Sequence, residues 1–100
     1  MKIVTICGSM KYEKQMQRIA FELETKHDCN VLQCIYGLKK DELTPQELSS
    51  LKQAQFERID ISDAIYVVDI DGYIGDSTKK EINYARQNGK EIIMHSDFNL

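Results

Sequence analysis

The sequence predicts an α/β fold with three layers, in which helices cover both faces of a four-stranded parallel sheet. Two observations lead to this prediction. Short runs of β-forming residues alternate with segments of helical periodicity along the 100 residues, and glycines, hydroxyl residues and a proline mark the boundaries between them. No linker, repeat or low-complexity tract interrupts the alternation. We therefore expect residues 1–100 to form one domain.

The first three expected elements are a strand, a helix and a second strand. Residues 2–7 (KIVTIC) are rich in β-branched residues, and Gly8 and Ser9 end this run. A helix is expected over residues 11–25, and the next strand over residues 29–35 (CNVLQCI). The inner face of the helix is expected to contain the residues that recur at helical spacing: Tyr12, Met16, Ile19, Ala20 and Leu23.

The second helix has a clear start signal after an irregular segment at residues 36–43. Thr44 is a typical capping residue, Pro45 suits the first helical position, and Glu47 follows three residues after the cap. We expect this helix to continue to about Ile61. Its inner face is expected to contain Leu48, Leu51, Gln55 and Ile59.

The C-terminal part of the chain continues the same alternation. Residues 64–70 (AIYVVDI) form the most hydrophobic strand, and a loop rich in glycine and hydroxyl residues follows over residues 70–77. A helix is expected from about residue 78 to residue 88, where an Asn-Gly pair ends it. The last expected strand covers residues 91–95 (EIIMH).

Parallel strands joined by right-handed crossovers give 2-1-3-4 as the expected strand order, as in flavodoxin-like and Rossmann-like folds. Such sheets bind ligands beyond the carboxyl ends of the strands, where the order reverses, here between strands 1 and 3. The loops at residues 7–10 and 70–77 should therefore lie side by side. Both lead into helix N-termini, whose free N–H groups suit a phosphate or a sugar hydroxyl. The candidate substrate-binding residues around these loops are Gly8, Ser9, Met10, Asp69, Tyr73, Gly75, Asp76, Ser77 and Thr78.

The composition argues against several kinds of partner. The formal net charge is −3 and no basic run is present, which is not typical of a protein that binds a nucleic-acid polymer. No apolar run approaches the roughly 20 residues of a membrane span. The N-terminal apolar run is followed at once by Gly-Ser, which is typical of a buried first strand rather than of a signal peptide. We expect a cytoplasmic protein with no membrane partner.

The sequence does not indicate a metal ion or another cofactor. Cys7, Cys29 and Cys34 lie in or beside strand-like runs, and the chain has no Cys-x-x-Cys pair and only two histidines. Reduced, structural cysteines are expected. Three aspartates near the end of the third strand could suggest magnesium, but aspartate is also a common turn and cap residue.

Glu81 allows two interpretations. Thr78 and Glu81 fit a capping box, in which the glutamate bonds back to the threonine amide. On a helical wheel, Glu81 instead shares a stripe with Ile82 and Ala85, so that it points to where the helix meets the sheet. There the helix dipole and free amides are expected to lower its pKa, while partial burial removes water. Such a carboxylate is suited to attack on an anomeric carbon.

Gln55 is also ambiguous, because it is a polar residue on an otherwise apolar helix face. Its amide could bond to backbone at the end of a helix. It could also reach into the site.

Three stretches carry a resemblance to a known family. They are ICGSMKY, SDAIYVVDI and GDSTKKEINYARQNGKEI. They resemble the first loop, the third strand and the catalytic helix of the nucleoside 2-deoxyribosyltransferase-like superfamily, which includes deoxynucleoside-monophosphate N-glycosidases. The last stretch is the most specific, since its carboxylate is followed by aliphatic and small residues and by Gly-Lys before the next strand. The resemblance covers nearly the whole chain.

This resemblance implies roles for individual residues. Glu81 falls on the superfamily's nucleophile, which forms a glycosyl-enzyme ester with deoxyribose. Gly8 and Ser9 fall on the loop that faces the sugar and phosphate, and residues 76–78 lie near the loop that binds the 5′ end of the sugar. The characterised enzymes have an aspartate that helps to protonate the leaving base. This chain has Gln55 there, and an amide is not a general acid.

The resemblance implies cleavage or transfer at the N-glycosidic bond of a nucleoside or nucleotide, with Glu81 and Gln55 as catalytic candidates. The alternative is a non-catalytic nucleotide-binding or sensing module on the same fold. A third possibility is a structural domain in which Glu81 is only a cap. We also expect a homodimer that completes the ligand site, because the sheet ends at a short strand and Tyr36, Tyr73 and Phe98 lie in loops and the tail.

Overall fold

A computed structural model describes residues 1–98 and confirms the predicted α/β architecture. The sheet is parallel throughout, and its order is β2-β1-β3-β4, as expected. The strands are β1 (Lys2–Gly8), β2 (Cys29–Leu32), β3 (Ala64–Val68) and β4 (Glu91–Met94). The helices are α1 (Glu13–Lys26), α2 (Pro45–Asp60) and α3 (Asp76–Gln87).

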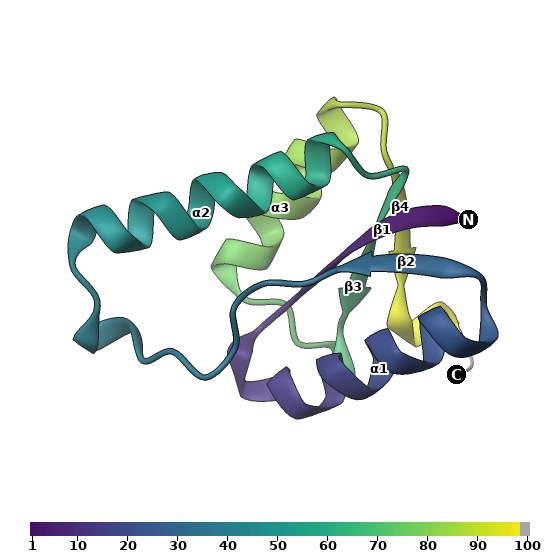
Figure 1. Cartoon of the computed structure of the whole chain (residues 1–100), viewed down its shortest axis with the longest axis horizontal. Helices are drawn as coiled ribbons and strands as arrows, with labels where there is room; N and C mark the ends of the chain where they lie inside the picture. The colour runs from purple at the N-terminus through teal and green to yellow at the C-terminus, as the bar shows by residue number, and fades with distance from the viewer. Residues whose placement is uncertain (99–100) are drawn as a thin grey trace.

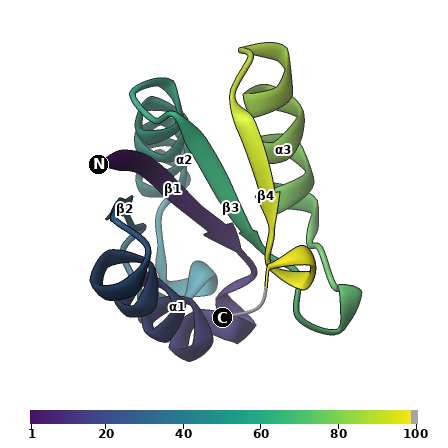
Figure 2. The same ribbon diagram turned by 90° about the vertical axis from the view of Figure 1, so that its right-hand side faces the viewer.

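The helices form layers on both faces of the sheet (Figure 1). α1 packs on one face, and α2 and α3 lie together on the other, as Figure 2 shows from the side. The strand order explains this arrangement, because the chain passes from β1 outward to β2 and then crosses back beyond β1 to β3. The reversal places the ends of β1 and β3 together in the middle of the sheet, where Gly8 pairs with Val68.

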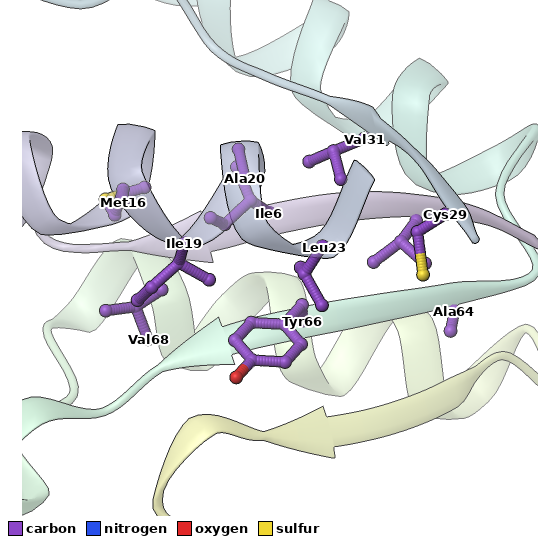
Figure 3. Packing of buried hydrophobic residues seen from close by; sticks show 11 residues of the cluster. Ile6, Met16, Ile19, Ala20, Leu23, Cys29, Val31, Ala64, Tyr66 and Val68 are labelled. Atoms are coloured by element: carbon purple, nitrogen blue, oxygen red, sulfur yellow. The ribbon is translucent and has the colours of Figure 1, made fainter. Parts of the chain in front are cut away.

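The larger hydrophobic core lies between α1 and the sheet (Figure 3). Met16, Ile19 and Leu23 of α1 are all less than 10% exposed and pack against strand residues such as Ile6 and Tyr66. Each buried side chain of this size stabilises the fold by about 1.5–3 kcal/mol. The predicted inner face of this helix is confirmed, except that the half-buried Tyr12 lies just before α1, in a short 3₁₀ turn.

A smaller core lies under α2 and α3. Ile59 of α2 and Ala85 of α3 are fully buried against Ile65 and Val67 of β3. The N-terminal half of α2 extends beyond the edge of the sheet (Figure 1), so that its apolar residues, including Leu51, are only half-buried. This half of α2 therefore owes less of its stability to the core than the half that contains Ile59.

The start of α2 is stabilised as predicted. The Thr44 hydroxyl accepts a 3.1 Å hydrogen bond from the Glu47 amide, and the Glu47 carboxylate accepts a 2.8 Å bond from the Thr44 amide. This reciprocal capping box, with Pro45 at the first helical position, satisfies backbone donors that a helix start would otherwise leave free.

Three of the predicted strands are too long at their C-terminal ends. β2 ends at residue 32 rather than 35, β3 at residue 68 rather than 70, and β4 at residue 94 rather than 95. Apolar residues continue beyond the strands because Tyr36 and Ile70 pack onto the core from loops. The sequence pattern indicates which residues are buried, and here the buried residues continue along the chain beyond the last residue that pairs in the strand.

None of the helices in the part of the chain that the structure describes is both long and apolar enough to cross a membrane. The cysteines at positions 7, 29 and 34 are free thiols, as predicted.

Candidate active site

The loops after β1 and β3 lie side by side, as predicted. The Tyr12 hydroxyl donates a 3.2 Å hydrogen bond to the Ile70 carbonyl, which joins the two loops directly. The rings of Tyr12 and Tyr73 also meet edge to face, with their centroids 6.3 Å apart. These contacts lie beyond the carboxyl ends of the central strands, where open α/β sheets bind ligands.

The first loop has strong structural reasons for its sequence. A Cβ atom on Gly8 would lie 3.1 Å from the Cβ of Val68 and 3.2 Å from the Met16 sulfur, so only glycine fits there without a shift. The Ser9 hydroxyl accepts a 3.4 Å hydrogen bond from the Lys11 amide and caps the short turn that Met10 begins. Contact of these residues with a ligand stays a prediction.

Asp69, at the end of β3, is engaged within the fold. Its two carboxylate oxygens accept hydrogen bonds of 2.8 Å and 2.6 Å from the amide and hydroxyl of Ser96. In the next turn, Asp71 and Gly72 both adopt the left-handed backbone conformation, with φ of 56° and 74°. Glycine adopts it without the steric cost that a side chain adds. Asp69 therefore anchors the turn after β4, and a role in substrate binding stays a prediction.

The capping-box interpretation of Glu81 is wrong. α3 begins at Asp76 after an extended Gly75, two residues earlier than predicted, so Thr78 is already inside the helix and is buried. An N-cap residue has non-helical backbone angles, which Thr78 does not have. The exposed Asp76 and Ser77 occupy the first turn, where the free N–H groups are.

The predicted inward orientation of Glu81 agrees with its contacts. Its side chain is partly buried, the following Ile82 is buried, and Ala85, one turn further on, is fully buried. The Oε1 atom of Glu81 accepts a 3.1 Å hydrogen bond from Nε2 of Gln55 on α2. The structure therefore brings together the two catalytic candidates that are 26 residues apart in the sequence.

Gln55 bonds to backbone, as one of its two interpretations expected, but in strand β1 rather than at the end of a helix, and a role in a ligand site stays a prediction. Besides its bond to Glu81, its Nε2 donates to the backbone carbonyl of Ile6 at 3.2 Å, while its Oε1 accepts from Nη1 of Arg58 at 3.0 Å. Two acceptors therefore face the amide nitrogen and one donor faces the amide oxygen, which fixes the orientation of the group. The pairing of β1 with β2 ends at Thr5. At the next residue of β1, the Ile6 carbonyl accepts its hydrogen bond from the side-chain amide of Gln55.

Two thiols complete the surroundings of the carboxylate. Gln55 Nε2 lies 3.7 Å from the sulfur of Cys7, which is fully buried, and Cys34 is partly buried nearby. Burial and the negative charge of Glu81 raise the pKa of Cys7 well above its ordinary value. Burial likewise raises the pKa of Cys34, although Arg58 acts in the opposite direction. The sequence did not indicate either thiol as a neighbour of Glu81.

The pKa of Glu81 is raised, whereas the sequence predicted a lowered value. Burial raises it, and the hydrogen bonds from Gln55 and Cys7 offset only part of this effect. Glu81 is the sixth residue of α3, counting from Asp76, and so lies beyond the free amides and dipole effect of the first turn. The result is a poorly hydrated carboxylate that is more basic than an exposed glutamate.

Lys11 is a further residue that the sequence analysis missed. Its Nζ lies 3.6 Å from the centre of the Tyr73 ring and 5.1 Å from that of Tyr12, so its ammonium group rests on an aromatic face. Tyr73 is 43% exposed, and its hydroxyl would lie 3.6 Å from a Cβ on Gly75. Arg58, also missed, lies three residues after Gln55, and that helical spacing was a usable signal.

The surface of the described residues has several hollows, of which two bear on the site. One of about 450 Å³ lies between the turns that follow β3 and β4 and includes Asp69 and Ser96 in its lining. Another of about 580 Å³ is lined by Ile35, Leu38 and residues of the first half of α2. Glu81 lines neither hollow. Within residues 1–98, no three His, Cys, Asp or Glu side chains are placed to hold a metal ion.

Comparison with known proteins gives one informative similarity. No family model matches the chain, and no curated protein matches it. Among solved structures, the chain is similar to the CMP N-glycosidase BcmB of Clostridium botulinum, with a TM-score of 0.58 and 19% identity. The match covers 93% of this chain and 70% of that protein. At this identity the similarity shows a shared fold, which confirms at the level of fold the resemblance carried by the sequence.

Proposed function

We propose that this protein cleaves the N-glycosidic bond of a nucleoside or nucleotide, with Glu81 as the nucleophile. The observation that carries the proposal is the burial and hydrogen bonding of the Glu81 carboxylate. It is partly buried on the inner face of α3, accepts a 3.1 Å bond from Gln55, and does not cap its helix. The fold shared with an enzyme that acts on CMP supports the same reaction.

The geometry suits displacement at C1′ of the sugar. Gln55 holds one carboxylate oxygen of Glu81, and the other oxygen forms the bond to C1′ while the base departs. Burial raises the pKa of Glu81, and a more basic carboxylate is the stronger nucleophile. Water then resolves the glycosyl ester to complete hydrolysis, or a second base resolves it to complete transfer.

The loops after β1 and β3 and the start of α3 offer groups for sugar and phosphate. Asp76 and Ser77 present free N–H groups at the N-terminus of a 12-residue helix, which favours an anion such as a 5′-phosphate. Ser9 and Tyr73 lie on the two loops that the Tyr12 hydroxyl joins. We propose that the ligand lies across these loops and that a second copy of the chain completes its pocket.

A non-catalytic nucleotide-binding module is the second candidate. The observation that favours it is Gln55, because an amide cannot protonate a leaving base. In that case Glu81 would accept hydrogen bonds from ribose hydroxyls and no bond would break. The same residues would then sense a nucleotide rather than consume it.

One experiment separates the two candidates. The protein is incubated with a panel of nucleosides and 5′-monophosphates of ribose and deoxyribose, and free base is measured by chromatography. The enzymatic proposal expects at least one member to release base in proportion to protein concentration. Tight binding of a member by calorimetry, with no base released from any, would instead establish the binding module.

A further inference from the structure

The groups around Glu81 determine how a base can leave when its N-glycosidic bond breaks. The inference drawn from them rests on the proposed function. Gln55 contacts the carboxylate, and both ends of its amide are engaged, by Ile6 and Glu81 at the nitrogen and by Arg58 at the oxygen. An amide has no acidic proton for a departing base. The Arg58 guanidinium remains protonated at all pH values where proteins fold.

The other groups near the carboxylate are poor acids as well. Burial raises the pKa of Cys7 and of Cys34, so both thiols hold their protons more firmly than an exposed cysteine. Tyr36, beside Cys34, also has a raised pKa because it is partly buried and lies close to that thiol. A base that becomes an anion on departure would find no ready proton among these side chains.

A separate observation points to a cation on the loop that leads into α3. The Lys11 ammonium lies 3.6 Å from the centre of the Tyr73 ring, so this ring face attracts positive charge, and a cationic base would bind there in place of Lys11. An aromatic face in this arrangement attracts positive charge and also stacks on flat rings. An acid, Asp71, is exposed on the same loop. This combination suits a heteroaromatic ring that is both flat and positively charged.

We propose that the substrates of this site are N-glycosides whose base carries a positive charge, such as pyridinium or N-alkylated purine nucleotides. In the first step the C1′–N bond breaks and its electron pair passes to the ring nitrogen, so the base leaves neutral and needs no proton. A Glu81 oxygen forms the new bond to C1′. Water then attacks C1′, the ester bond breaks, the Glu81 carboxylate is restored, and the released proton passes to solvent.

The test compares two substrates of nearly the same shape, guanosine 5′-monophosphate and its 7-methyl derivative, whose base is cationic. Each enzymatic rate is divided by the spontaneous rate of the same compound, because the methylated nucleotide is intrinsically labile. We expect this ratio of enzymatic to spontaneous rate to be at least 100-fold larger for the 7-methyl compound than for guanosine monophosphate. We also expect nicotinamide mononucleotide to release nicotinamide.

A variant checks that the missing proton is the cause. In Gln55→Glu, the adjacent Glu81 favours a protonated side chain at position 55, which can serve as an acid. We expect the ratio of kcat/KM for guanosine monophosphate to kcat/KM for the 7-methyl compound to gain at least tenfold. Ratios of enzymatic to spontaneous rate within threefold of each other in the wild type, or no gain in this variant, would overturn the inference while leaving the N-glycosidase intact.

Binding provides a readout that does not depend on turnover. In Glu81→Gln protein we expect the 7-methyl compound to bind at least tenfold more tightly than guanosine monophosphate. Tyr73→Leu, added to this background, should abolish the preference, and Phe21→Leu, at another exposed aromatic residue, should preserve it. Equal affinities in Glu81→Gln would overturn the charge recognition. Absence of base release from every substrate would reject the proposed function itself.

Discussion

The side-chain nitrogen of Gln55 on α2 lies 3.1 Å from a carboxylate oxygen of Glu81 on α3. This contact places the only acid on the inner stripe of α3, among residues 76–87, against an amide that β1 and Arg58 hold in one orientation. The carboxylate is therefore positioned by three elements, which is more support than a helix cap or a solvent-exposed glutamate requires.

Replacement of Glu81 by glutamine tests the nucleophile. The change keeps size and hydrogen bonding but removes the anion proposed to attack C1′, so we expect base release to fall by at least about 10³-fold while ligand binding is retained. Mass spectrometry of the wild type with a slow 2-fluoro-substituted substrate should find a sugar adduct on the peptide that contains Glu81. Glu57→Gln, an exposed change on α2, is the control. A variant at position 81 with wild-type activity would exclude the mechanism.

The pH dependence of stability tests the environment of Glu81. Burial raises its pKa above the ordinary value of 4.5, so between 4.5 and the raised value the folded chain binds more protons than the unfolded chain. Stability must then fall as the pH rises through that window. Glu81→Gln lacks this titrating group and does not lose stability in this way. The melting temperature of the variant minus that of the wild type should therefore increase from pH 4 to pH 7. A constant difference between the two proteins across this range would contradict the prediction.

Replacement of Gln55 by leucine tests the amide. The Ile6 carbonyl and the Arg58 guanidinium lose their partner, and we expect a loss of about 1–3 kcal/mol in the free energy of unfolding. The pKa of Glu81 should rise further, because the hydrogen bond that lowers it is removed. Urea unfolding and carbon-13 NMR titration measure the two effects. Gln53→Leu, an exposed change on the same helix, should show neither effect.

We expect the chain to form a homodimer at micromolar concentration. β4 is an edge strand, and Ile35 and Leu38 are exposed beside a hollow of about 580 Å³. Covering such apolar surface favours association. Sedimentation should show a dimer, and Leu38→Asp should weaken it at least tenfold, whereas Lys39→Asp should not. A monomeric wild type at this concentration would refute the expectation.

The sequence was sufficient for the fold because its signals are local and repeated. Alternation of apolar strands with amphipathic helices gave the element order, and the crossover rule gave the sheet order. The capping box at Thr44 was predictable because all of its residues lie within one turn. The strand ends were not, since Tyr36 and Ile70 are buried by tertiary contacts that periodicity cannot distinguish from strand pairing.

The candidate site was predictable only in part, for the same reason. The helical wheel placed Glu81 toward the sheet, but its raised pKa depends on burial and on neighbours from β1 and α2. The false cap at Thr78 came from a motif that fits locally, while Gly75 started the helix earlier. The contact of Lys11 with Tyr73 joins loops about 60 residues apart, so the local sequence pattern does not indicate it.

The engagement of both ends of Gln55 also constrains how this protein can diverge. An ionised acid at position 55 would face the Ile6 carbonyl and the Glu81 carboxylate together, while a leucine would leave Arg58 without its acceptor. Substitutions at positions 55, 58 and 81 are therefore expected to be accepted jointly rather than one at a time. Lineages that lose the glutamate at position 81 become free to change the other two, so covariation among these three positions would mark where the proposed activity has been lost or altered.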